Sequence, residues 1–157
     1  GRLRQNVGFE PLPHNDPRPW RSVRASEDRR VRPLPEGMIA GSDIAAEAVA
    51  VCQANNRRLP HGERVRVDRR DFRRLEELGH RVIVCNPPYG IRLTGETDLG
   101  EFYREFGDFL KQRCQGSTAY VYFGNREMLK HIGLKPSWKR PLKNGGLDGR
   151  LARFELY

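Results

Sequence analysis

The sequence predicts an α/β fold with a doubly wound, mostly parallel sheet that ends in an antiparallel hairpin. Two observations lead to this fold class. From residue 38 onward, short apolar or β-branched runs alternate with helical patterns, as they do in strand–helix units. Near the end of the chain, residues 137–143 and 151–157 flank Asn144-Gly145-Gly146, which is typical of a tight turn between antiparallel strands.

Residues 1–36 differ from the rest of the chain, because they carry six prolines, many arginines and little apolar periodicity. We expect an irregular, mostly extended linker here, with a short helical turn at about residues 20–30. A folded domain is then expected over residues 37–157.

The first elements of this domain should be a strand, a helix and a second strand. The apolar run that starts at Met38 ends in Ser42-Asp43, and the alanine-rich residues 44–58 follow as a helix. Residues 64–67 alternate at period two and predict the second strand. Residues 81–85 contain a continuous apolar run bounded by polar residues, which is typical of a central parallel strand buried on both faces.

The second half of the domain continues the alternation. A helix is expected to begin at Asp98, where Glu101 can close a capping box. Six residues at helical spacing give this helix one apolar face: Leu99, Phe102, Tyr103, Phe106, Phe109 and Leu110. Residues 118–123 predict another strand, and Asn125 is expected to cap a short helix that ends near Gly133.

The formal net charge of +9 comes from 29 Lys and Arg against 20 Asp and Glu, which favours a polyanionic partner. Charge alone does not choose between nucleic acid and an anionic membrane surface. No apolar stretch approaches the roughly 20 residues that span a bilayer, and no signal-like leader opens the chain. The three cysteines lack metal-ligand spacing, which predicts reduced thiols in a cytoplasmic protein without a metal site.

The most informative stretch is Asn86-Pro87-Pro88-Tyr89, which directly follows the apolar strand. The two prolines fix φ and remove two backbone donors, so we expect a stiff turn with outward-facing carbonyls. Asn86 precedes a proline and is therefore extended, and its side-chain oxygen can accept a hydrogen bond from an amino group. Tyr89 offers a flat face for a planar ring. The alternative is a rigid surface turn.

This tetrapeptide resembles the signature of S-adenosylmethionine-dependent methyltransferases that modify exocyclic amines of nucleobases. With its flanking segments, the chain is similar to the THUMP-associated RNA guanine-N2 methyltransferase family. The segments that carry the resemblance are Gly41-Ser42-Asp43-Ile44, Arg70-Asp71-Phe72, residues 86–90 with Arg92-Leu93, residues 102–111 and residues 143–151.

The resemblance implies a Rossmann-like class I methyltransferase fold, S-adenosyl-L-methionine as cofactor, and RNA as substrate, ribosomal rather than transfer RNA. The implied residues are Asn86, Pro87, Pro88 and Tyr89 for catalysis, and Asp43, Ile44, Asp71, Phe72 and Asn86 for the cofactor. From their charge and position we expect Arg92, Lys139, Arg140 and Lys143 to contact RNA. Each charged residue also has a structural reading: Asp43 as a helix cap, Asp71 in surface ion pairs, and the cations as solvated side chains.

Two features depart from the family pattern. Ile91 stands where the family usually has an acidic residue, and no glycine-rich strand–turn unit precedes Gly41. We therefore expect residues 37–157 to be a partial catalytic domain without its first strand–helix unit and without the upstream THUMP domain. Two alternatives remain: an adenine-N6 methyltransferase acting on DNA or RNA, and a non-catalytic RNA-binding remnant. The sequence makes no prediction of oligomeric state.

Overall fold

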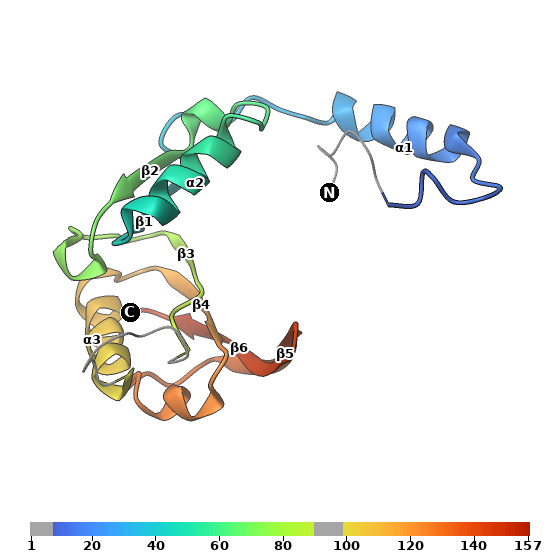
Figure 1. Ribbon diagram of the computed structural model, residues 1–157. Helices are drawn as coiled ribbons and strands as arrows, with labels where there is room; N and C mark the ends of the chain where they lie inside the picture. The colour runs from blue at the N-terminus through green and yellow to red at the C-terminus, as the bar shows by residue number, and fades with distance from the viewer. Residues whose placement is uncertain (1–7, 90–98) are drawn as a thin grey trace. The chain divides into compact units, whose positions relative to one another are not determined.

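The computed structural model describes residues 8–89 and 99–157 (Figure 1). The chain divides into two compact units. One unit extends to Arg70, and the other comprises Asp71–Tyr157. Each unit is described by itself. The boundary expected between residues 36 and 37 stays a prediction.

The first unit contains a longer helix than the sequence suggested. Helix α1 (Pro17–Arg29) occupies much of the segment expected to be irregular, with a short turn at most. The Asp16 side chain caps the helix by accepting a hydrogen bond from the Arg18 backbone N–H at 3.0 Å. Two of the six prolines, Pro17 and Pro19, lie in its first turn, where a missing N–H costs nothing, and the other four lie outside the helix.

A strand–helix–strand unit follows α1. Strand β1 (Ala40–Asp43), helix α2 (Ala46–Asn56) and strand β2 (Arg66–Arg69) lie as the sequence predicts, with β2 starting two residues later than expected. The short 3-10 helix η1 (Gly62–Arg64) leads into β2. The two strands pair in parallel, with Ala40 opposite Arg66.

The second unit is built on a four-stranded mixed sheet in the order β3-β4-β6-β5. Its strands are β3 (Val82–Cys85), β4 (Thr118–Phe123), β5 (Trp138–Asn144) and β6 (Leu147–Glu155). Strands β3 and β4 are parallel, whereas β6 is antiparallel to both β4 and β5. The predicted C-terminal hairpin is thus confirmed. Its two-residue turn places Gly145 at a φ of +58°, which a glycine adopts without strain.

Helix α3 (Leu99–Arg113) connects β3 to β4 and packs on one face of this sheet. The 3-10 helices η2 (Phe72–Arg74) and η3 (Arg126–Lys130) complete the unit, and Asn125 caps η3 as predicted. Alternate residues of β4 and β6 meet α3 in an apolar core. Its fully buried side chains include Tyr103, Leu110, Cys114, Val121, Phe123, Ile132 and Phe154. The expected start of the helix at Asp98 lies outside the described residues.

The position of β3 differs from the expectation of a central strand buried on both faces. It is the edge strand of the described four-stranded sheet, and Val82 and Val84 are 72% and 79% exposed. Successive side chains of a strand point to opposite faces. In this unit Ile83 and Cys85 pack against the core. The other two apolar side chains of the run therefore face away from it.

No helix in the described part of the chain is long and apolar enough to cross a membrane. Within the same residues, no group of three or more His, Cys, Asp or Glu is arranged to hold a metal ion.

Candidate active site

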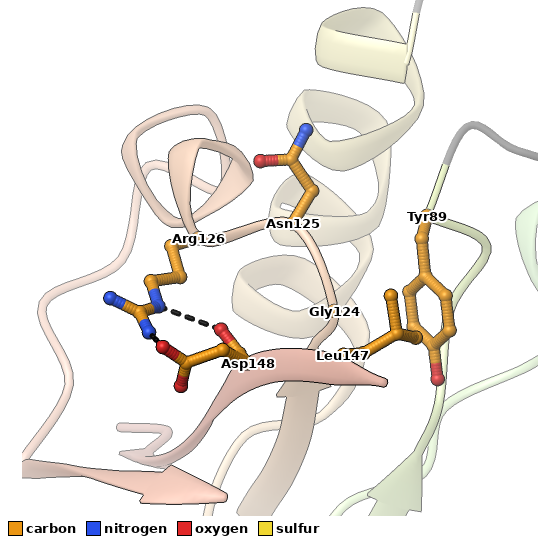
Figure 2. Close-up of a pocket in the computed structure, with 6 residues that line it drawn as sticks. All are labelled: Tyr89, Gly124, Asn125, Arg126, Leu147 and Asp148. Carbon is orange, nitrogen blue, oxygen red and sulfur yellow. Dashed lines mark hydrogen bonds and ion pairs between the residues drawn. The ribbon is translucent and has the colours of Figure 1, made fainter. Parts of the chain in front are cut away.

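A pocket of about 550 Å³ lies where the parallel strands β3 and β4 end. Residues 86–89, here called the 86–89 loop, follow β3, and Gly124 and Asn125 follow β4. Because β6 is antiparallel to β4, its first residues reach the same edge. Six residues line the pocket: Tyr89, Gly124, Asn125, Arg126, Leu147 and Asp148 (Figure 2). Ligands of open α/β sheets bind at the carboxyl ends of strands.

The Tyr89 ring forms one wall of the pocket and is held on two sides. It lies so close to Gly124 that a Cβ there would stand 2.5 Å from the Tyr89 Cδ1 atom. Its edge meets the Tyr122 ring, with centroids 5.7 Å apart and planes at 81°. The Tyr89 hydroxyl also donates a hydrogen bond to the Asn86 side-chain oxygen. The two polar members of the 86–89 loop are therefore joined to each other.

Of the two prolines of the loop, one is buried and the other is half-buried with its carbonyl hydrogen-bonded to α3. Pro87 is buried, and the Pro88 carbonyl accepts a hydrogen bond from the Tyr103 hydroxyl at 3.4 Å. The expectation that the carbonyls of this turn face outward is thus wrong for Pro88, because α3 packs behind the loop. Burial raises the pKa of Tyr103 well above its usual value, with Cys85 and Tyr89 adding to the shift. Its hydroxyl therefore stays protonated at neutral pH.

The polar part of the pocket is made by residues after β4 and at the start of β6. Arg126 forms an ion pair with the Asp148 carboxylate, and its Nε donates to the Asp148 backbone oxygen at 2.7 Å (Figure 2). The Asn125 side-chain oxygen accepts from the Glu127 N–H at 3.1 Å and caps η3. These contacts leave an open pocket with one aromatic wall and one charged wall.

The sequence reasoning did not single out Gly124, Arg126, Leu147 or Asp148 as members of this pocket. One signal was available for the residues after β4. The strand at residues 118–123 was expected, and in a parallel pair its carboxyl end must lie beside that of the preceding strand. The approach of Leu147 and Asp148 depends on the antiparallel register of β6, which no local pattern in the chain specifies.

Asp71 and Phe72 have structural contacts within the second unit. The Asp71 side chain accepts from the Arg73 N–H at 3.0 Å at the start of η2 and pairs with the Arg73 guanidinium at 3.3 Å. Arg73 also pairs with Glu105 of α3. The Phe72 ring makes edge contacts at 5.4–5.6 Å with Phe102, Phe106 and Phe109. Their expected contacts with the cofactor stay predictions.

Asp43 and Ile44 belong to the first unit. Asp43 is the last residue of β1, and its Oδ1 accepts from the Ala45 N–H at 2.8 Å just before α2. The N-cap residue of α2 is Ala45 itself, whose side chain makes no capping hydrogen bond. Ile44 is 62% exposed. Asp43 therefore stabilises the turn into the helix from the carboxyl end of a parallel strand.

Three of the four cations expected to contact RNA are exposed on β5, but they do not share one face. Strand alternation puts Lys139 and Lys143 on one face of the sheet and Arg140 on the other. The Arg140 guanidinium lies over the Trp138 ring, 5.1 Å from its centroid. Arg92 and Ile91 lie outside the described residues.

The chain is similar in sequence to known methyltransferase proteins. The chain matches the family model of the RMKL-like methyltransferase domain (UPF0020) over residues 1–153. A Synechocystis protein named "Putative RNA methyltransferase slr0064" is 34% identical over 158 residues, which cover 100% of this chain and 41% of that protein. The ribosomal RNA large subunit methyltransferase K/L of Hahella chejuensis is 33% identical, over 100% of this chain and 23% of its own length. The chain therefore spans well under two thirds of these relatives.

Solved structures share the fold. SMU.472, described as "a putative methyltransferase complexed with SAH", has a TM-score of 0.81 at 22% identity, covering 99% of this chain and 41% of its own. A methylase from Listeria monocytogenes, described as predicted to be N6-adenine-specific for DNA, has a TM-score of 0.70 at 25% identity, covering 90% and 36%. The predicted Rossmann-like class I methyltransferase fold is confirmed.

Proposed function

Because this chain belongs to the family of RMKL-like methyltransferase domains (UPF0020), we propose that it carries the base-binding loop of a cytoplasmic RNA methyltransferase. The proposed reaction transfers a methyl group from S-adenosyl-L-methionine to the exocyclic N2 amine of guanine. Ribosomal RNA is the proposed substrate, ahead of transfer RNA.

The observation that carries this proposal is the 86–89 loop at the end of β3, with Tyr89 as a wall of an open pocket. An amide oxygen and an aromatic face, next to each other, match the two parts of an aminated base. A flat ring can stack on Tyr89, while its amino group donates to the Asn86 oxygen. A base that undergoes such chemistry must first leave its helix or loop.

Asn86 and the neighbouring Pro87 carbonyl would orient the amine for attack. The amine lone pair is normally delocalised into the ring. Hydrogen bonds from both amino hydrogens to the Asn86 Oδ1 and the Pro87 oxygen would hold the group and favour a more pyramidal nitrogen. In the structure the Asn86 oxygen already accepts from the Tyr89 hydroxyl, so the amide is turned toward the ring on which the base would stack. No side chain is assigned as a base before attack, because catalysis here is positioning and electrostatics. After transfer, the methylated nitrogen would release its extra proton to water.

The residues proposed for the cofactor are compatible with an adenosine group. The Asp43 carboxylate lies at the carboxyl end of β1, where one oxygen stabilises the turn into α2 and the other can accept from ribose hydroxyls. Asp71 and Phe72 are proposed to contact adenine. The cofactor supplies an electrophilic methyl group on a sulfonium, and the leaving group provides the driving force.

The RNA is proposed to contact Lys139, Arg140, Lys143 and Arg92. The chain carries a net charge of +9, and the three cations of β5 are exposed. Phosphate contacts by such side chains position a nucleic acid but do not read its sequence.

The second candidate is methylation of adenine N6. The same loop can bind the adenine amine, and the similar Listeria protein is described as a predicted N6-adenine-specific DNA methylase. A non-catalytic RNA-binding remnant is the third reading, and cofactor binding separates it from both enzymes. Titration calorimetry that detects sub-millimolar binding of S-adenosylmethionine would exclude it.

The test is to methylate ribosomal RNA with labelled S-adenosylmethionine, digest the product, and identify the nucleoside by mass. We expect N2-methylguanosine, and we expect Asn86→Ala to slow transfer by about 10²-fold, as for other single polar groups that hold a reacting centre. Asn55→Ala, an exposed substitution on α2, is the matched control. N6-methyladenosine would support the second candidate, and full activity of Asn86→Ala would remove the proposed role of the loop.

A further inference from the structure

We propose that Tyr103 is a positioning residue for the 86–89 loop, acting through the Pro88 carbonyl. The inference rests on the proposed function of that loop, and it assigns a role to a core residue that is not among the six residues lining the pocket. Three observations carry it: a buried ring, a hydroxyl that remains a donor, and a target loop whose two prolines have no N–H.

The Tyr103 ring is fixed by its surroundings. The residue is 0% exposed. Its ring stacks on Phe123 at a centroid distance of 5.4 Å and an interplanar angle of 26°, and Phe102 meets it edge-on at 5.6 Å. A buried ring packed against two other rings has a fixed direction for its hydroxyl, since the C–O bond lies in the ring plane.

That hydroxyl is directed at the loop. It donates to the Pro88 oxygen at 3.4 Å, and Cys85 and Tyr89 are close enough to influence its ionisation. A buried hydroxyl needs a partner, and so does a carbonyl that faces the core. The contact therefore satisfies a polar group on α3 and one on the loop at the same time.

The loop depends on such external contacts because of its own sequence. Pro87 and Pro88 have no N–H, so the centre of the loop cannot donate to any acceptor. At its centre the loop can therefore only accept hydrogen bonds, through its carbonyl oxygens, from donors elsewhere in the unit. By fixing the Pro88 carbonyl, Tyr103 sets the plane of the peptide that leads into Tyr89. The direction of the Tyr89 ring over Gly124 follows from that plane.

Removing one oxygen atom tests this role. Tyr103→Phe keeps the ring and the core volume but leaves the Pro88 carbonyl without its donor. We expect kcat to fall by about 10-fold or more, because displacement of a positioning group by about 1 Å can cost 10²-fold in rate. The KM for S-adenosylmethionine should change less than kcat, since Asn86 is the only residue assigned to the cofactor that belongs to this loop.

Ser117→Ala is the matched control. The Ser117 hydroxyl is also buried, donating to the Leu78 oxygen at 2.7 Å and accepting from the Arg81 N–H at 2.9 Å. It lies just before β4, at the opposite end of that strand from the pocket. We expect this variant to lower the melting temperature at least as much as Tyr103→Phe does, with kcat unchanged. Equal losses of kcat in both variants would assign Tyr103 a purely structural role.

A second measurement does not need activity. The chain has five tyrosines, so 3-fluorotyrosine labelling gives five ¹⁹F resonances, and Tyr89→Phe identifies that of Tyr89. In Tyr103→Phe we expect the Tyr89 resonance to narrow and move toward the position of free fluorotyrosine, and in Ser117→Ala to stay in place. An unmoved resonance overturns the proposal. If the wild-type protein methylates no RNA, the proposed function fails, and the ¹⁹F result alone then decides the role of Tyr103.

Discussion

Gly124→Ala should displace the Tyr89 ring and leave the fold intact. A Cβ at position 124 would lie 2.5, 2.6 and 2.7 Å from three atoms of that ring. Carbon atoms in contact are ordinarily about 3.5–4.0 Å apart, so the ring must move by about 1 Å. The φ of Gly124 is not among the positive values of the described residues, so alanine adds no backbone strain. The whole perturbation falls on Tyr89.

The expected cost is in rate rather than stability. A misplacement of about 1 Å corresponds to about 10²-fold in transfer rate, or about 2.7 kcal/mol of transition-state free energy. The free energy of unfolding should fall by only about 1 kcal/mol, because Tyr89 is half-buried and borders an open pocket into which its ring can move.

Single-turnover methylation with saturating S-adenosylmethionine measures the chemical step directly. Gly146→Ala is the matched control, since a Cβ there meets no atom within 4 Å and its φ is not positive. We expect the control to keep the wild-type rate. A Gly124→Ala rate within about threefold of wild type would refute the reasoning, because it would mean that the position of Tyr89 does not govern transfer.

Two further predictions concern RNA contacts and ionisation. Replacing Lys139 and Lys143 together by alanine should flatten the slope of log affinity against log salt concentration by about two units, as measured by fluorescence anisotropy; an unchanged slope would remove their face of β5 from the RNA interface. Burial raises the pKa of the Cys114 thiol from 9.0 to about 11, so the folded protein holds this proton more tightly than the unfolded chain. The contribution of this proton to the free energy of unfolding is complete below about pH 9. It is lost as the pH rises toward 11, which lowers the free energy of unfolding by about 2 kcal/mol. Urea denaturation of the reduced protein should show this decline, and Cys114→Ala should flatten it; equal pH dependence in both proteins would contradict the assignment.

The elements that could be predicted from the sequence are those whose local pattern and packing agree. The apolar face of α3 and the strand at residues 118–123 were predicted closely, because each buries one face in the same core. Helix α1 is longer than the short turn that the sequence predicts, because proline-rich composition indicates an irregular segment. In the structure Pro17 and Pro19 lie in the first turn behind the Asp16 cap, a position where proline is well tolerated. Composition alone does not distinguish these two contexts.

The apolar run before the loop shows the limit of pattern more clearly. An apolar run such as residues 82–85 indicates that both faces of a strand are suited to burial, but it does not predict which elements cover them. Within its own unit β3 has core contacts on one face, through Ile83 and Cys85. The exposure of Val82 and Val84 therefore depends on which elements pack beside the strand, and the sequence of the run alone does not predict it.

In the candidate site, too, the sequence predicts the functional residues but not their geometry. Asn86 and Tyr89 could be found from the sequence because their chemistry lies in the residue types and in the prolines between them. The geometry of the loop comes from elsewhere: its prolines cannot donate hydrogen bonds, so its position depends on Tyr103 of α3, Tyr122 of β4 and the bare Cα of Gly124. A tetrapeptide transplanted without these neighbours would keep its functional groups and lose their alignment. Substitutions far from the motif in sequence should therefore impair transfer as strongly as substitutions within it.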